Sequence, residues 1–229
     1  MDWQAGAGLS LRKREHSVMP ANLLDPAVRR HLYISIAKKR AGPGSGSGPE
    51  TLWARTWRRP VFDLRTLTSV PFVVGGGVAT RLYAPERMID DLDILIEAQK
   101  AALLSADLTG RGCQKLGSLP IGGSHWRLPD GTALDSVEES APWAAEAIAH
   151  PALGPDGLPV IALPYLVLMK MRAGRAIDIG DLSRILGAAD ESSLALTRSV
   201  MAANLPDGLE DLESLIQLGR LEYGASTPL

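Results

Sequence analysis

The sequence predicts an α+β (α/β) fold, in which a small mixed and twisted sheet is flanked by helices and followed by a helical C-terminal part. One observation is the short apolar run Phe72–Val74, which ends in three glycines and is followed by a helix-like and then a second strand-like segment. A second observation is the pair Asp130-Gly131, which separates two alternating segments and is typical of a β-hairpin.

The first regular element is predicted to be a basic helix. Asp25 followed by Pro26 is a typical helix start, with Asp as N-cap and Pro in the first turn, and the helical pattern continues toward Lys39. Residues 41–49 then consist almost only of Gly, Ser and Pro, which is the composition of a linker. We therefore expect three parts: a basic N-terminal extension (1–49), a catalytic domain (50–162) and a helical C-terminal region (163–229).

The remaining elements follow from hydrophobic periodicity and turn residues. Strands are predicted at 72–74, 92–96, 125–128 and 133–137. Helices are predicted at 63–67, 78–83, 143–149, 165–172, 178–186 and 209–218.

The bulk composition predicts a soluble globular protein of the cytoplasm. The chain has 229 residues, 45% of them hydrophobic, and its net charge is −2. No apolar run reaches the roughly 18 residues that would predict a membrane helix, so no membrane contact is expected. The single cysteine, Cys113, excludes an internal disulfide framework and fits a reducing compartment.

Charge is unevenly distributed along the chain. Residues 1–60 contain eleven Lys and Arg against four Asp and Glu, so the rest of the chain is acidic. Such a basic segment either contacts nucleic acid or complements the acidic body of its own protein.

The residues that indicate chemistry lie between the glycine turn and the hairpin. Asp91 and Asp93 are two apart in a predicted strand, so their carboxylates point to the same face and are suited to bind a divalent cation. Asp135, on the hairpin, is placed to share this metal or to accept a proton. The glycine turn before a helix is suited to phosphate, because it exposes backbone N–H groups. Together these residues predict phosphoryl or nucleotidyl transfer.

The segment FVVGGGVATRLYAPERMIDDLDILI, residues 72–96, resembles the signature of the nucleotidyltransferase superfamily, with its polymerase-beta-like fold. In particular it resembles the branch of the AbiEii-type toxin nucleotidyltransferases, which carries an Arg at the place of Arg87. The segment LVLMKMRAGRAIDIGDL, residues 166–182, is similar to the downstream helical segment of that family. The resemblance covers about half of the chain.

This resemblance implies a role for each matching residue. Gly76, Gly77, Arg87 and Lys170 would bind the nucleotide. Asp91, Asp93 and Asp135 would be the catalytic residues and would hold Mg²⁺ or Mn²⁺. The substrate would be an NTP, and ATP is one of the candidates.

Three further polar residues are expected to have structural rather than chemical roles. His125, in the hairpin, is expected to be structural rather than to contact a base or assist proton transfer. Asp178 and Asp181 are three apart on one helix face and are expected to pair with Arg175 or Arg184.

The leading hypothesis is therefore an enzyme that moves an NMP from an NTP to a hydroxyl acceptor and releases pyrophosphate. The acceptor is tRNA or another RNA, a protein side chain or a small molecule. The resemblance also suggests that the protein is a toxin, whose partner would be a cognate antitoxin. Two alternatives stay open: a catalytically idle antitoxin, scaffold or nucleotide-binding module, and a nucleic-acid-binding protein that uses the basic residues 1–60.

Overall fold

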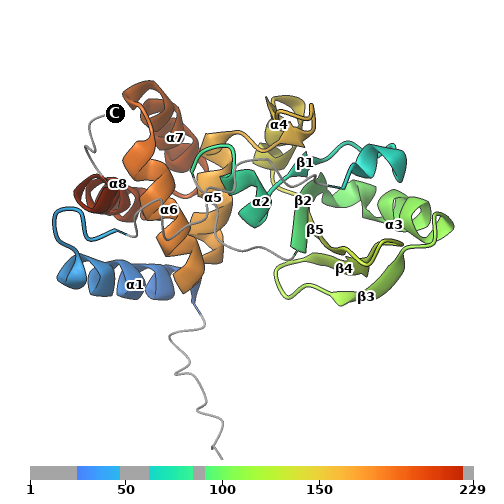
Figure 1. Cartoon of the computed structure of the whole chain (residues 1–229), viewed down its shortest axis with the longest axis horizontal. Helices are drawn as coiled ribbons and strands as arrows, with labels where there is room; N and C mark the ends of the chain where they lie inside the picture. Colours follow the sequence, from blue (N-terminus) through green and yellow to red (C-terminus); the bar gives the residue numbers. More distant parts are fainter. Residues whose placement is uncertain (1–24, 47–61, 85–90, 224–229) are drawn as a thin grey trace, which may run out of the picture.

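In the computed structural model, residues 25–46, 62–84 and 91–223 are described (Figure 1). The strands form a mixed sheet at one end of the molecule, and five helices gather at the other end. Among the described residues, no helix combines the length and the apolar character needed to span a bilayer.

Eight α-helices and three short 3-10 helices are present in the described ranges. The α-helices are α1 (Pro26–Arg40), α2 (Gly76–Thr80), α3 (Ala101–Gly110), α4 (Pro142–Ala149), α5 (Leu163–Ala173), α6 (Ala176–Ala188), α7 (Glu191–Asn204) and α8 (Leu209–Tyr223). The 3-10 helices are η2 (Leu64–Thr66), η3 (Ala98–Lys100) and η4 (Pro206–Gly208).

Seven strands form one sheet in the order β3-β4-β5-β2-β1-β7-β6. Their bounds are β1 (Val73–Val74), β2 (Asp91–Glu97), β3 (Gln114–Ser118), β4 (Gly123–Arg127), β5 (Ala133–Glu139), β6 (Ala152–Leu153) and β7 (Pro159–Val160). The long central strands β2 and β5 are parallel, whereas β4 pairs antiparallel with β5 and β1 pairs antiparallel with β2. The predicted α+β class with a mixed sheet and a helical C-terminal part is confirmed.

Most predicted elements are found, with small differences at their ends. The hairpin around Asp130 joins β4 to β5, and Gly131 adopts the positive φ of 90° that this turn needs. The helix predicted at 78–83 is instead the five-residue α2, which begins directly at Gly76. The strands β3, β6 and β7 and the helices α3 and α7 were not predicted. The strand β3 is exposed along its whole length, so it lacks the apolar alternation on which a strand prediction depends.

The basic helix α1 packs on the C-terminal helices rather than standing apart. Asp25 caps it as predicted, accepting a hydrogen bond from the backbone N–H of Ala27 at 2.8 Å. The buried Arg30 donates from Nε to Asp211 of α8 at 2.6 Å and from Nη1 to the carbonyl of Met171 at 3.1 Å. A buried guanidinium needs such partners, because an uncompensated charge would be strongly destabilising. Part of the positive charge of the N-terminal segment is thus compensated within the protein.

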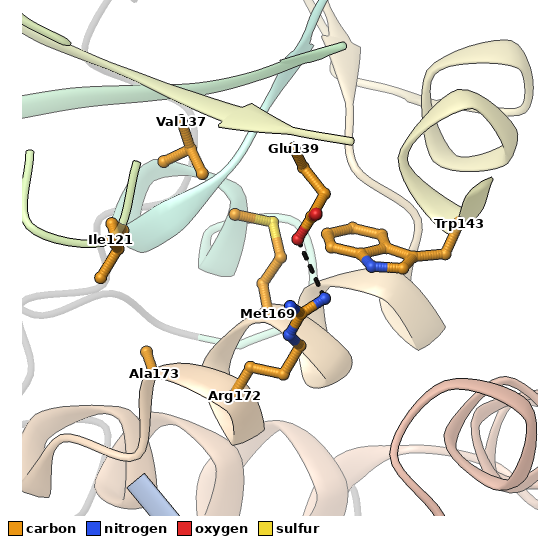
Figure 2. Close-up of a pocket in the computed structure, with 7 residues that line it drawn as sticks. All are labelled: Ile121, Val137, Glu139, Trp143, Met169, Arg172 and Ala173. Carbon is orange, nitrogen blue, oxygen red and sulfur yellow. Dashed lines mark ion pairs between the residues drawn. The ribbon is translucent and has the colours of Figure 1, made fainter. Parts of the chain in front are cut away.

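The sheet and the helical end meet across α5. Arg172 of α5 pairs with Glu139 of β5 at 2.9 Å, and its guanidinium lies over the indole ring of Trp143, with 5.6 Å to the ring centroid. Figure 2 shows this ion pair at the side of a pocket that Met169 and Val137 also line. The helices α5 and α6 therefore face the central strands, where the predicted carboxylates lie.

Two glycines allow α6 and α8 to approach closely. A Cβ added at Gly187 would lie 2.5 Å from the carbonyl oxygen of Gly219, and one added at Gly219 would lie 2.1 Å from the carbonyl oxygen of Ser183. Both contacts are with backbone atoms, which cannot rotate away as the end of a side chain can. The crossing of these helices therefore requires glycine at both positions.

We expect Gly187→Ala to lower the free energy of unfolding by about 2 kcal/mol or more, because the added methyl group forces the two helix backbones apart. Gly180→Ala is the matched control on the same helix. Its Cβ would meet nothing within 4 Å, so the better helix propensity of Ala should stabilise the protein by about 0.5–1 kcal/mol. Urea unfolding of both variants measures the difference. Equal stability of the two would show that the close crossing does not constrain the fold.

Candidate functional site

The strand register places polar residues of three neighbouring strands in one row across the sheet. Asp93 of β2 lies directly opposite Asp135 of β5, and Asp135 lies directly opposite His125 of β4. On the other side, the backbone N–H of Gly75 donates to the carbonyl oxygen of Asp93 at 2.9 Å. Because side chains alternate along a strand, Asp91 points to the same face as Asp93, while Leu92 between them is buried.

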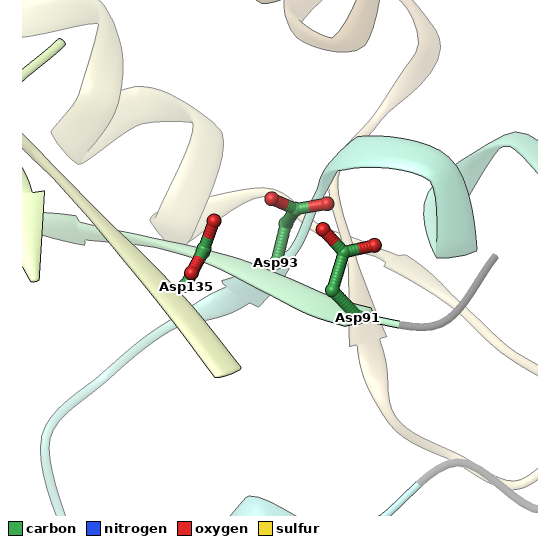
Figure 3. A group of neighbouring side chains, drawn as sticks. All are labelled: Asp91, Asp93 and Asp135. Carbon is green, nitrogen blue, oxygen red and sulfur yellow. The ribbon is translucent and has the colours of Figure 1, made fainter. Parts of the chain in front are cut away.

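The three predicted carboxylates converge on this face (Figure 3). One carboxylate oxygen each from Asp91, Asp93 and Asp135 lies within 4.8 Å of the other two. Asp91 is exposed, and the other two are half-buried. Oxygen atoms of carboxylates at this spacing are the donor set that Mg²⁺ and Mn²⁺ prefer. The three residues therefore fit a divalent cation by the chemistry of their donors.

The glycine turn between β1 and α2 fits around the carboxylate of Asp93. Gly76 has a φ of +55°, and a Cβ added to it would lie 1.7 Å from Oδ2 of Asp93. The backbone of Gly77 acts on the same carboxylate and lowers its pKa. The turn thus needs glycine at position 76 because the aspartate fills the space that a side chain would take.

Burial and like charges perturb the central carboxyl group. The pKa of Asp93 is raised from 3.8 to about 6, first because burial disfavours its charged form and then because Asp91 and Asp135 repel it. The backbone of Gly77 and the positive charge of Lys170 oppose this rise in pKa. A bound cation would remove the repulsion, so the electrostatics of the site also fit a metal.

Lys170 of α5 belongs to a buried group of charges beneath the site. Its side chain is 4% exposed, and its Nζ lies 2.8 Å from Oδ2 of Asp181 and 3.5 Å from Oδ1 of Asp178. Both aspartates lie on α6 and pair with arginines three residues away, Arg175 with Asp178 and Arg184 with Asp181, as the sequence predicted. Lys170 also lines the cavity in front of the carboxylates.

His125 contacts the third carboxylate. Its Nδ1 is hydrogen-bonded to Oδ1 of Asp135, from the position directly across the hairpin. Such a contact fixes the orientation of a carboxylate, which a metal ligand or proton acceptor needs. The sequence analysis expected a structural histidine. The hairpin centred on Asp130 was a signal that these two residues face each other.

The carboxylates open into a cavity of about 350 Å³. Its lining combines Gly76, Asp93 and Asp135 from the sheet with Lys170 and Arg175 from the helices. A second pocket of about 240 Å³ shares four residues with it, which are Ile121, Val137, Met169 and Ala173. The two hollows therefore adjoin.

The second pocket continues along β5 beyond Asp135 (Figure 2). Val137 and Glu139 follow Asp135 at alternate positions, so all three side chains point to the same face. Trp143 forms part of the wall, and its buried Nε1 has no hydrogen-bond partner among the described residues. The pocket offers apolar walls together with the Glu139–Arg172 ion pair.

The structure thus brings together most of the residues predicted for the site. Asp91, Asp93 and Asp135 form the cluster, with Gly76 and Gly77 against Asp93 and Lys170 in the cavity lining. Arg87 lies outside the described residues. Sequence reasoning gave no chemical role to Arg175, which lines the cavity, or to His125, which contacts Asp135.

In the absence of divalent cations, we expect Asp93→Asn to stabilise the protein at pH 7 by about 1–3 kcal/mol. The pKa of Asp93 is near 6 in the folded state and 3.8 in the unfolded state. The folded protein therefore loses stability as the pH rises and this carboxyl group ionises. The gain should shrink as the pH falls from 6 toward 4, where wild-type Asp93 is protonated in the folded state. Urea unfolding with a chelator at several pH values measures this, with Glu97→Gln on the same strand as control. A variant less stable than wild type at pH 7 would contradict the expected repulsion.

A second expectation concerns the glycine turn. Gly76→Ala should lower Mn²⁺ affinity by about 10-fold or more, because the methyl group displaces the carboxylate of Asp93. Gly75→Ala is the matched control, since its Cβ would meet only Met169, at 3.7 Å. Titration of each variant with Mn²⁺, followed by electron paramagnetic resonance, gives the affinities. Unchanged affinity in Gly76→Ala would show that Asp93 takes no part in metal binding.

No protein-family model matches this chain, and no curated protein matches it either. Among solved structures, a crystal structure of ANT(2″)-Ia in complex with adenylyl-2″-tobramycin is similar, with 23% identity, a TM-score of 0.34 and coverage of 67% of this chain and 89% of that chain. A solution structure of the antibiotic-resistance factor ANT(2″)-Ia has 16% identity, a TM-score of 0.36 and coverage of 86% and 92%. At these identities and TM-scores the likeness decides neither fold family nor function, so function is inferred from the site.

Proposed function

We propose that this protein is a nucleotidyltransferase that moves an NMP from an NTP to a hydroxyl acceptor with the help of Mg²⁺ or Mn²⁺. The observation that carries this proposal is the convergence of three carboxylates beside a glycine turn, at the edge of a cavity that also contains cationic side chains. The cluster suits a phosphate-bound cation, because Mg²⁺ is usually held by few carboxylates and completed by substrate oxygens.

Asp91, Asp93 and Asp135 would hold the metal. A cation bound there supplies charge neutralisation for the triphosphate and stabilises the charge that develops on the reacting phosphate. Lys170 adds positive charge from the floor of the cavity, where it also lowers the pKa of Asp93. Gly76 and Gly77 shape the wall beside Asp93.

Asp135 is the residue best placed to take the proton of the acceptor. The acceptor oxygen would form a bond to the α-phosphorus, and the bond from this phosphorus to the bridging oxygen of pyrophosphate would break. The hydroxyl proton passes to the carboxylate of Asp135, and pyrophosphate leaves. The contact from His125 keeps that carboxylate oriented toward the cavity.

The pocket along β5 is the proposed place of the acceptor. It begins next to Asp135 and ends at the Glu139–Arg172 pair, so a molecule lying in it would present a hydroxyl group to the proton acceptor. Its volume of about 240 Å³ favours a compact hydroxylated group, such as a small molecule or one end unit of a polymer. RNA and protein acceptors therefore remain within the proposal, as does a toxin with a cognate antitoxin.

The test is transfer of label from each α-³²P-labelled NTP, with Mg²⁺, to total tRNA, to cell protein and to a set of small hydroxylated compounds. We expect label in one acceptor class. Asp91→Ala/Asp93→Ala should abolish transfer, because the metal loses two ligands. Asp135→Asn should lower kcat by about 10²- to 10⁴-fold, because the proton acceptor is lost.

Glu97→Ala serves as the control in this assay, since it removes a carboxylate from the same strand but outside the cluster. It should keep wild-type transfer. Metal-dependent NTP binding without transfer to any of the three acceptor classes would favour the idle nucleotide-binding module. Absence of NTP binding would contradict the proposed function altogether.

A further inference from the structure

We propose that Arg175 binds the triphosphate of the nucleotide, as a guanidinium held in place by Asp178. This inference rests on the nucleotidyltransferase function proposed above and adds a residue to it. Arg175 is the N-cap residue of α6 and lines the same cavity as Gly76, Asp93 and Asp135. It lies on the helical side of the cavity, and the carboxylates lie on the sheet side.

Asp178 anchors both the side chain and the backbone of Arg175. Nε of Arg175 donates to Oδ2 of Asp178 at 2.7 Å, and Nη2 donates to Oδ1 at 3.2 Å. The backbone N–H of Arg175 donates to the same Oδ2 at 3.3 Å. These bonds use two of the five N–H groups of the guanidinium, so three remain for a ligand. A guanidinium fixed in this way loses little freedom when a phosphate binds.

Among the three neighbouring cationic side chains, that of Arg175 is the most exposed. Lys170, Arg175 and Arg184 surround the buried carboxylates of Asp178 and Asp181. The side chains of Lys170 and Arg184 are 4% and 11% exposed, whereas that of Arg175 is 66% exposed. Arg175 is therefore the cation of this group that is both exposed and part of the cavity lining.

Arg175 lines the same cavity as Asp93, whose negative charge acts on it. The pKa of Arg175 is raised chiefly by its hydrogen bond to Asp178, and the negative charges of Asp93 and Asp91 raise it further. A triphosphate bound to a cation at the carboxylates would extend into this positive field. Arginine suits the task because its planar fork matches the oxygens of phosphate in a bidentate way. Lys170 differs, because its ammonium already lies between two carboxylates.

The experiment measures the affinity of Arg175→Gln for the α,β-methylene analogues of the four NTPs and for the four NMPs, by calorimetry with Mg²⁺. These analogues resist nucleotidyl transfer, so binding is separated from reaction. We expect the affinity for the triphosphate analogue that wild type binds to fall by about 10- to 100-fold, and the affinity for the monophosphate to change by less than about threefold. Arg175→Lys, which keeps the charge but loses the fork, should fall between wild type and Arg175→Gln.

Arg198→Gln is the matched control, because Arg198 forms a similar bidentate pair with Glu213 (2.6 and 3.0 Å) and does not line the cavity. Its affinities should equal those of wild type. If wild type binds the analogues and Arg175→Gln binds them equally well, the inference is overturned while the proposed function stands. Equal losses for triphosphate and monophosphate would also overturn it. If wild type binds no analogue, the proposed function itself fails.

Thermal unfolding of each variant checks that it is folded. If Arg175→Gln does not fold, the affinities of Arg175→Lys test the inference in its place.

Discussion

The packing of the Asp93 carboxylate against the backbone of Gly76 and Gly77 is the constraint on which the site depends. It joins β2 to the turn between β1 and α2, and it permits only glycine at position 76, where a Cβ would overlap the carboxylate. The carboxylate stays half-buried beside two other negative charges, and the backbone of Gly77 offsets only part of the rise in its pKa. The fold thus holds a carboxyl group whose charged form is disfavoured in the absence of a cation. Such stored electrostatic strain is typical of a functional site rather than of a structural turn.

The helical end of the molecule compensates this negative charge from the other side of the cavity. Lys170 is buried on α5, where an unpaired ammonium would be costly, and the carboxylates of Asp178 and Asp181 satisfy it. These aspartates lie on α6, whose position is fixed by the glycine crossing with α8. Arg30 in turn ties α1 to Asp211 of α8. This chain of contacts runs from α1 through α8 and α6 to α5, and it holds Lys170 and Arg175 on the side of the cavity opposite the carboxylates.

The sequence predicted the central elements well, because their signals are local. The alternation around Asp91 and Asp93, the Asp130-Gly131 turn and the Asp25-Pro26 helix start each depend on a few adjacent residues, and each is present in the fold. Features without a local sequence pattern were harder to predict. The exposed strand β3 has no apolar pattern, and the role of Gly76 depends on a residue 17 positions away. Sequence reasoning assigned that glycine to phosphate approach, which stays a prediction, and the structure adds its contact with Asp93.

The register of the hairpin is the part of the site that could be predicted from the sequence. A turn centred on Asp130 pairs residues that lie equally far on either side of it, so His125 must face Asp135. Because β5 is parallel to β2, the same register sets Asp135 beside Asp93, and one row of the sheet then carries His125, both carboxylates and the glycine turn. The parallel pairing of β2 with β5 cannot be read from either strand alone, since about 35 residues separate them. A local turn therefore orders half of the site, and the sheet topology completes it.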